Sequence, residues 1–217
     1  TKEELLKVAE SLPYSLTVDE VPEISGVGNY ALTVRSSDGK KDACVLYCID
    51  SNTYSTIKGI KGYDYIKRDQ IDWYCKKSAE FTRNNGGEPV PSLAFFHIAL
   101  PEFNQAASDE NAQLYGIRRE KACAPALNSG LFTAIKENGD VMGIFVGHDH
   151  DDDYAVCWHD VLLAYGRFTG GNTEYNHLTN GARVIELNEG TRSFDTWIRT
   201  KAGVEQLTSY PDSFVKE

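Results

Sequence analysis

Apolar residues recur at helical spacing in three parts of the chain. In residues 1–12, TKEELLKVAESL, they lie three and four positions apart, and Thr1 with Glu4 forms a capping box that marks a helix N-terminus. A second stripe, at spacings of three, four and seven, predicts an amphipathic helix from Lys67 to Phe81. A third helix is expected between Asn128, a good N-cap, and Gly139, a good C-terminal stop.

Short apolar runs between these helices predict strands. They occupy residues 29–36, 43–50, 92–100, 141–146, 154–159, 161–168, 182–188 and 194–200.

The pattern within and between these runs indicates how the strands pair. Asp38-Gly39 is a hairpin turn between the first two runs, and the last four runs form two further hairpins. Residues 43–49 are apolar at every position, so we expect that strand to be covered on both faces. The order of elements predicts an α/β fold with a mixed β-sheet, flanking helices and an antiparallel edge. Residues 101–126 are expected to form a long functional loop with short helical turns.

Composition narrows the class of protein. The chain has 217 residues, 41% hydrophobic and 25% charged, which suits one globular domain or a closely joined pair. A formal charge of -10 without a basic cluster argues against nucleic acid and anionic membranes as partners. No apolar stretch approaches the ~20 residues of a membrane span, so a soluble protein is expected. Five scattered cysteines are too few for a disulfide scaffold. Because residue 1 is Thr, we expect that upstream residues have been removed.

Candidate metal ligands follow two of the expected strands. His97 comes after SLAFF, and His148 and His150 come after VMGIFV. In α/β sheets, ligands collect beyond the carboxyl ends of the strands, so neighbouring strands would bring these imidazoles to one rim. Residues two apart in an extended segment share a face, which would point His148 and His150 the same way and turn Asp149 aside. Imidazole suits zinc, iron, manganese or nickel.

Other interpretations of these residues remain open. His97 is compatible with an ordinary histidine at the rim of the core. Alternating aspartates within residues 149–153 suggest calcium, but Tyr154 stands where an EF-hand loop needs Gly and Asp160 where it needs Glu. A solvated acidic loop is the alternative interpretation of residues 151–153.

Weaker candidates lie elsewhere. Cys157 and His159 are expected to pack in the core, and His177 to lie on the surface, with the segment YGRFTGGNTEYNH as a candidate rim of a pocket. Ser129 lacks a nucleophile elbow, and no cysteine has a histidine nearby in a catalytic setting. The sequence therefore offers no catalytic side chain, and the residues that bind substrate stay unknown.

Three stretches together resemble the calcineurin-like metallophosphoesterases, in particular their purple-acid-phosphatase-like branch: LAFFHIALPEFNQ, GIRREKACAPALNSGLFTAI and GIFVGHDHDDDY. The resemblance covers nearly the whole chain, including LYCIDSNTYS and GYDYIKRDQIDWY. It implies an αββα sandwich and hydrolysis of phosphate esters at a dinuclear centre of iron, zinc or manganese. His97 and His148 then match ligands of one metal, and His150 a ligand of the other.

The chain also departs from that family. The first three family motifs, which supply the bridging carboxylate and a substrate-facing histidine, do not occur in it, so residues 1–217 resemble the C-terminal half of a phosphoesterase domain. Asp152 stands where the branch often has Asn. We therefore expect the chain alone to bind metal poorly, with no ion held, and to turn over little substrate. Its expected partners are the phosphate ester, the missing N-terminal half and, through an exposed sheet face, a second copy of itself.

A second class of function competes with the enzyme. A non-catalytic α/β binding or assembly module would keep the same architecture and a single metal. The sequence leaves open the metal, the choice between monoester and diester, and the oligomeric state. The compartment is also open, although the resemblance and the absent initiator Met favour a secreted or periplasmic protein.

Overall fold

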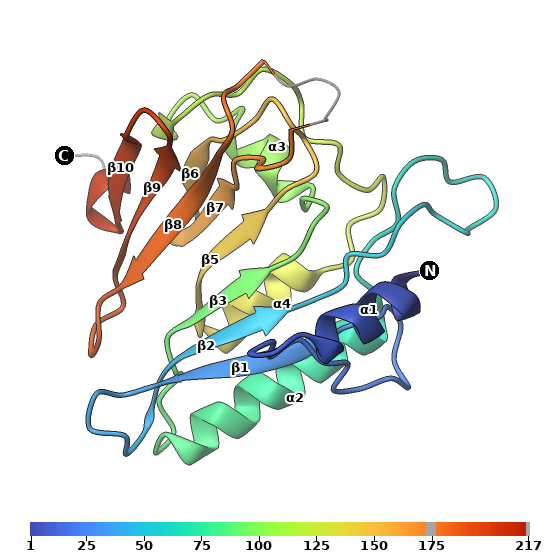
Figure 1. Cartoon of the computed structure of the whole chain (residues 1–217), viewed down its shortest axis with the longest axis vertical. Helices are drawn as coiled ribbons and strands as arrows, with labels where there is room; N and C mark the ends of the chain where they lie inside the picture. Colours follow the sequence, from blue (N-terminus) through green and yellow to red (C-terminus); the bar gives the residue numbers. More distant parts are fainter. Residues whose placement is uncertain (172–176, 216–217) are drawn as a thin grey trace. The chain divides into compact units, whose positions relative to one another are not determined.

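The computed structural model describes residues 1–171 and 177–215. Two compact units divide the chain (Figure 1): the first unit comprises residues 1–96 and 126–141, and the second unit comprises residues 97–125 and 142–217. The helices and strands are α1 (Lys2–Ser11), β1 (Tyr30–Arg35), β2 (Asp42–Cys48), α2 (Arg68–Asn84), β3 (Ser92–Phe95), α3 (Glu102–Ala106), β4 (Leu114–Tyr115), α4 (Leu131–Asn138), β5 (Val141–Val146), β6 (Ala155–Trp158), β7 (Val161–Tyr165), β8 (Gly181–Leu187), β9 (Phe194–Thr200), β10 (Val204–Tyr210) and the 3-10 turn η1 (Asp212–Phe214).

The first unit contains the three helices that the periodicity predicts. Thr1 caps α1 through the expected capping box with Glu4. Helix α2 ends three residues beyond its predicted end at Phe81. The predicted cap of α4 is wrong, because Gly130 at φ 84° is the N-cap. Asn128 lies two residues before it, and its side chain accepts the Gly130 N–H at 2.9 Å. Helices α2 and α4 contact each other.

Strand β2 is less covered than its sequence predicts. It pairs antiparallel with β1 across the expected turn, where Gly39 has φ 70°, and parallel with β3. Val45 and Tyr47 are buried, but Leu46 and Cys48, on the opposite face, are only half-buried. The prediction of coverage on both faces is therefore wrong at these positions, and Cys48 lines an open hollow of the first unit.

The second unit holds both predicted hairpins. Strand β7 pairs parallel with β5 and antiparallel with β6, and β6 pairs with the short β4. Strands β8, β9 and β10 form a separate antiparallel sheet in the order β10-β9-β8. The sequence did not reveal β10, since VEQLTSY has little apolar alternation.

The fold class is the predicted one. Among the described residues the larger sheet has seven strands in the order β1-β2-β3-β5-β7-β6-β4, with parallel and antiparallel pairs, and helices flank it. Strands β5 and β7 are buried at every position and form the centre of the core. Residues 101–126 are mostly irregular around α3 and β4, as expected for a long loop. Within the described residues, no helix is long and apolar enough to cross a membrane.

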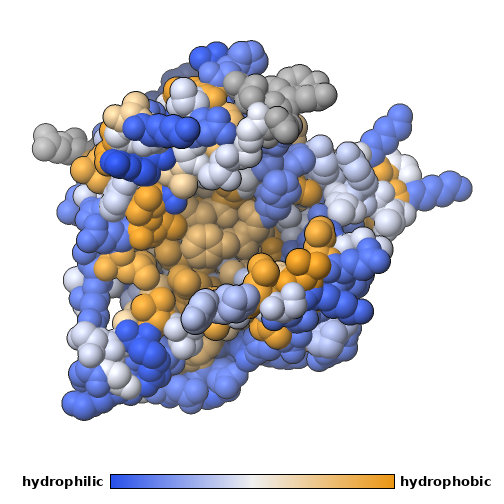
Figure 2. Space-filling view, in the orientation of Figure 1, coloured by the Kyte–Doolittle hydropathy of each residue, from blue (hydrophilic) through white to orange (hydrophobic). Residues whose placement is uncertain are grey.

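Apolar side chains are exposed along α1 in the first unit. Helix α1 buries none of its residues, and Leu5, Val8 and Leu12 are 72%, 59% and 56% exposed. Figure 2 shows hydrophobic surface gathered in this region of the molecule. Beside α1 lies a hollow of about 390 Å³ that is lined by Leu5, Leu6, Ala9, Tyr30, Cys48 and Phe95, among others. We name Leu5, Val8, Leu12 and this hollow the α1 surface.

Candidate metal centre

Two of the three predicted ligands meet at one point of the second unit. His97 follows β3 and His148 follows β5, and the Gly147 N–H donates to the His97 carbonyl at 3.1 Å. His97 Nε2 lies 3.2 Å from His148 Nδ1, and the two ring centroids are 5.0 Å apart with the rings nearly perpendicular. The predicted convergence of these two imidazoles is therefore confirmed. His150 lies two residues further on, in a turn, and its role as a ligand stays a prediction.

The spacing of the two imidazole nitrogens fits a shared ion. Zinc–nitrogen bonds of about 2.0–2.1 Å in a tetrahedral site place neighbouring nitrogens roughly 3.3 Å apart. The 3.2 Å between His97 Nε2 and His148 Nδ1 is close to that value. His97 is exposed and His148 is half-buried, so solvent reaches both rings. The two nitrogens are also at hydrogen-bond distance from each other, and the same spacing would let this pair hold a divalent cation.

The backbone at His148 differs from the predicted extended segment. His148 has φ 78°, a left-handed conformation that is uncommon outside glycine, and the Asp149 N–H donates to the Gly147 carbonyl at 3.0 Å. The chain thus turns sharply at His148. The prediction that His148 and His150 point the same way assumed an extended segment, and that assumption is wrong.

Asp149 is turned aside, as predicted, but into the protein. Its carboxylate is buried and accepts the Cys123 N–H at 3.2 Å through both oxygens. The Tyr165 hydroxyl donates to Asp149 Oδ2 at 2.6 Å. These bonds tie the histidine-bearing turn to β7 and to the loop of residues 101–126.

The three aspartates that follow are not a solvated loop. Asp151, Asp152 and Asp153 are 6%, 1% and 0% exposed, so that interpretation is wrong. Each carboxylate has partners that are remote in sequence, which no local pattern could show. The loop is therefore a buried polar structure beneath the histidines.

Asp151 contacts His177, one of the weaker candidates from the sequence. Its carboxylate accepts the backbone N–H of His177 at 2.7 Å, and its Oδ2 lies 2.5 Å from His177 Nδ1. His177 is exposed on the surface, as expected, while this contact holds it beside the residue that follows His150. The middle of the candidate rim, residues 172–176, lies outside the described residues.

Asp152 carries an unusual charge environment. Its Oδ1 accepts the N–H groups of Arg119 and Glu120 at 2.8 and 3.1 Å, while its buried Oδ2 has no hydrogen-bond partner among the described residues. Burial, aided by the carboxylates of Asp149 and Glu120, raises the pKa of Asp152 to about 6 despite those backbone N–H donors.

Asp153 anchors the loop to the three-stranded sheet. Its carboxylate forms an ion pair with Arg167, and both side chains are almost completely buried. It also accepts the Ile117 N–H at 2.7 Å and the Gln206 amide at 2.9 Å. Arg183 donates to the Asp153 carbonyl at 2.6 Å, and burial lowers the pKa of Arg183 to about 10. This network fixes the loop behind His150.

The other candidates lie apart from this site. His159 is exposed at the turn between β6 and β7, where φ is 47°, so its expected place in the core is wrong. Cys157 is half-buried in β6, which fits the expectation in part. The described residues contain one cluster of potential ligands from His, Cys, Asp or Glu, formed by Glu120, Cys123 and Asp149, which the sequence analysis did not find.

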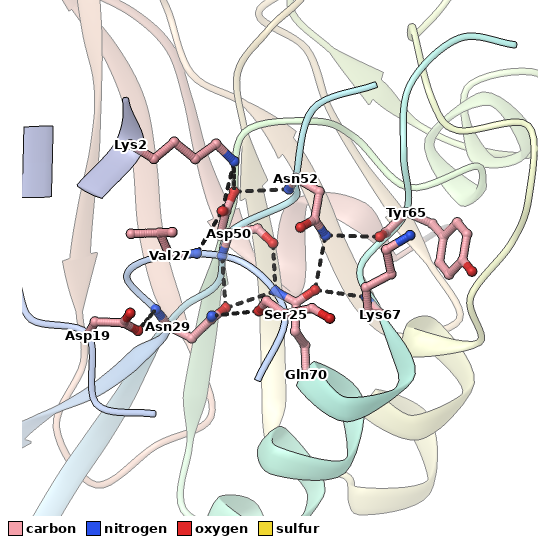
Figure 3. Close-up of polar contacts among 10 residues, drawn as sticks. All are labelled: Lys2, Asp19, Ser25, Val27, Asn29, Asp50, Asn52, Tyr65, Lys67 and Gln70. Atoms are coloured by element: carbon pink, nitrogen blue, oxygen red, sulfur yellow. Dashed lines mark hydrogen bonds and ion pairs between the residues drawn. The ribbon is translucent and has the colours of Figure 1, made fainter. Parts of the chain in front are cut away.

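A second polar network lies in the first unit, at the end of β2 (Figure 3). Asp50 accepts two bonds from the Lys2 ammonium at 2.6 and 2.7 Å and one from the Val27 N–H at 2.9 Å. The buried side chains of Asn29 and Gln70 bond to each other at 2.9 Å and to the backbone of Asp50. Because these groups satisfy one another, the network holds α1 and α2 in place and is structural.

Comparisons with known proteins agree with the resemblance. The chain is 36% identical over 180 residues to "Probable inactive purple acid phosphatase 29" of Arabidopsis thaliana, covering 76% of the chain and 46% of that protein. It is 33% identical to "Probable inactive purple acid phosphatase 14" of the same plant, covering 78% of the chain and 46% of that protein. It is 32% identical to "Phosphatase DCR2" of Saccharomyces cerevisiae, covering 97% of the chain and 38% of that protein. No protein-family profile matches the chain.

The chain spans about half the length of the curated relatives it matches, or less. A solved structure of a single mutant of Vps29 from Entamoeba histolytica aligns to 79% of this chain and 99% of that one at 10% identity, with a TM-score of 0.29, which is too low to carry an argument. The sequence relatives, together with the paired histidines at the strand ends, confirm the predicted family: this chain belongs to the purple-acid-phosphatase-like branch of the calcineurin-like metallophosphoesterases.

Proposed function

We propose that this chain is the C-terminal part of a phosphoesterase domain that hydrolyses phosphate esters at a dinuclear metal centre. His97 and His148 hold one metal and His150 contributes to the other. The observation that supports this most strongly is the 3.2 Å separation of His97 Nε2 and His148 Nδ1 at the ends of two strands. Relatives named as phosphatases point to the same chemistry.

The protein's own residues orient the site. Two metal ions, when bound, supply Lewis-acid polarisation of the phosphoryl oxygens and a water of lowered pKa. Asp149 and Tyr165 hold the histidine-bearing turn, and the bond between Asp151 and His177 places an exposed imidazole beside it. No protein nucleophile is needed for this reaction.

The site is incomplete in residues 1–217. Three imidazoles without a bridging carboxylate cannot hold two metals in close proximity, and the family motifs that supply the carboxylate do not occur in the sequence. We propose that a preceding half-domain supplies them, since the relatives are about twice as long. Iron, zinc and manganese are the candidate metals.

The names of several relatives favour a second candidate function. Three Arabidopsis thaliana proteins similar to the chain are named "inactive". A non-catalytic binding or assembly module that retains the histidine pair and a single metal would fit those names.

Metal binding and turnover test the two functions separately. Cobalt or zinc affinity is measured for Cys123→Ser, which removes the thiol of the neighbouring cluster of Glu120, Cys123 and Asp149, and for His97→Ala and His148→Ala in that background, with the exposed His159→Ala as the matched control. We expect His97→Ala and His148→Ala, but not His159→Ala, to lose the remaining binding. Equal affinities in all four proteins would refute the site.

Turnover of a chromogenic phosphate ester is then measured with residues 1–217 alone and with a chain extended to include the family's first three motifs. We expect activity only in the extended chain. Turnover by residues 1–217 at the rate of intact enzymes would contradict the incomplete site. Bound metal without turnover in the extended chain would favour the module.

A further inference from the structure

Three side chains gather in the second unit beside the histidine-bearing turn, where Asp149 is buried, Glu120 is half-buried and Cys123 is exposed. Glu120 and Cys123 belong to the long loop, and Asp149 follows β5. One carboxylate oxygen of Glu120, the Cys123 Sγ and one carboxylate oxygen of Asp149 all lie within 4.8 Å of one another. None of these three groups is a ligand of the proposed phosphoesterase centre, although Asp149 helps to hold its histidine-bearing turn.

The carboxylates of the cluster and of Asp152 form no ion pair within the part of the chain that the structure describes. Among the described residues, no lysine, arginine or histidine forms an ion pair with Glu120, Asp149 or Asp152. The carboxylates of Asp149 and Asp152 are almost completely buried. Burying carboxylates without a compensating charge is costly, so the arrangement would be stabilised by a bound cation.

An unsatisfied oxygen beside the cluster points to a ligand independently. Asp152 is 1% exposed, and its Oδ1 is fixed by the N–H groups of Arg119 and Glu120. Among the residues that the structure describes, its Oδ2 is buried without a hydrogen-bond partner. The carboxylate adjoins the cluster, because its Oδ1 accepts the N–H of Glu120 at 3.1 Å. A buried carboxylate oxygen of this kind is rare in native proteins and calls for an ion or a water.

We propose that Glu120, Cys123 and Asp149 form a cation site of the zinc type, with Asp152 as its outer carboxylate. A thiolate with carboxylates suits Zn²⁺, and its heavier analogue Cd²⁺, better than Ca²⁺ or Mg²⁺, which take oxygen ligands alone. A bound cation would link the long loop to the turn that carries His148 and His150.

Small movements are enough to form the site. Bonds of about 2.0–2.3 Å to oxygen and sulfur place tetrahedral ligand atoms roughly 3.3–3.8 Å apart. The three atoms, within 4.8 Å of one another, must approach by about 1 Å. Burial and the carboxylate of Asp149 raise the pKa of Cys123 to about 12, so the thiol deprotonates at neutral pH only with a cation present.

Cobalt spectroscopy tests this proposal. Co²⁺ bound by a thiolate gives a charge-transfer band in the near ultraviolet, which histidine and carboxylate ligands do not give. We expect the protein to develop this band on titration with Co²⁺, Cys123→Ser to lack it, and the matched control Cys75→Ser to keep it. Glu120→Gln should weaken Co²⁺ binding at the band by about tenfold or more.

Two further measurements separate this site from the proposed phosphoesterase centre. The double variant His148→Ala, His150→Ala should keep the charge-transfer band, so its loss there would assign the band to the histidine site and overturn the proposal. In the wild-type protein, Zn²⁺ should slow alkylation of Cys123 but not of Cys75, as followed by peptide mapping. Unchanged alkylation of Cys123 at saturating Zn²⁺, or a band that persists in Cys123→Ser, would also overturn it.

Discussion

Replacing Arg167 with Met tests whether the buried ion pair with Asp153 stabilises the aspartate-rich loop of residues 149–153. Met keeps most of the apolar stem of the side chain and removes the guanidinium. That group donates to Asp153 Oδ2 through Nε at 3.0 Å and through a second, shorter bond, and to the Thr179 carbonyl at 2.7 Å. The variant therefore leaves a carboxylate buried in the second unit without its cation.

The expected cost follows from what Asp153 retains. Breaking one side of a buried ion pair costs about 3–5 kcal/mol. Asp153 keeps its hydrogen bonds from the Ile117 N–H at 2.7 Å and the Gln206 amide at 2.9 Å, so we expect a cost at the lower end of that range. We expect a loss of about 3 kcal/mol in the free energy of unfolding, equivalent to a fall of roughly 6–12 °C in Tm for a chain of this size.

Urea denaturation followed by tryptophan fluorescence measures this loss. Arg199→Met is the matched control, since Arg199 is exposed on β9, and its free energy of unfolding should change by less than about 0.5 kcal/mol. The double variant Asp153→Asn, Arg167→Met should recover part of the loss, because it removes the unpaired charge. A loss below about 1 kcal/mol in Arg167→Met would refute the reasoning.

Three other predictions concern separate parts of the chain. Because burial raises the pKa of Asp152 to about 6, the folded state retains a proton that the unfolded chain releases near pH 4, so the folded state loses stability as pH rises from about 4 to 6. In chelator-treated protein, Asp152→Asn should therefore raise the free energy of unfolding by about 2–3 kcal/mol at pH 7.5 and by almost nothing at pH 4, as measured by urea denaturation. Equal effects at both pH values would contradict this prediction. Gly116→Ala should lower the free energy of unfolding by about 3 kcal/mol or more, since φ is 106° and a Cβ would lie 2.9 Å from the Tyr154 Cα. Gly190→Ala, at φ 78° in open space, should lower it by only about 1 kcal/mol. Similar Tm values for the two variants would show that the contact at Gly116 is not costly. Leu5→Glu with Leu12→Glu should convert self-associated protein to monomer in light scattering after gel filtration, because both side chains are exposed on the α1 surface, and a wild-type protein that is strictly monomeric would end that prediction.

The sequence predicts the histidine pair because the relevant signals are local. Apolar runs that end before His97 and at Gly147 define two strand ends, and the sheet rule places such ends on one edge. The geometry confirms that expectation for His97 and His148. The turn at His148 is not visible in the sequence, because a positive φ at a histidine is set by surrounding hydrogen bonds and has no compositional signal.

The acidic loop shows where local reasoning fails. Four aspartates in five positions are typical of a solvated turn, and only distant partners reverse that expectation. Arg167 and His177 lie 14 and 26 residues beyond the carboxylates that they contact. Glu120 precedes Asp149 by almost 30 positions, so no spacing rule would group them with Cys123.

Hydrophobic periodicity, hairpin turns and helix caps depend on residues within a few positions of one another, and for this reason the sequence by itself determined the helices, most strands and the fold class. The burial of charge depends on groups that meet only when the chain has folded. The tertiary structure alone therefore decided which carboxylates are paired, which oxygen lacks a partner, and which side chains of the long loop face the turn that carries His148 and His150.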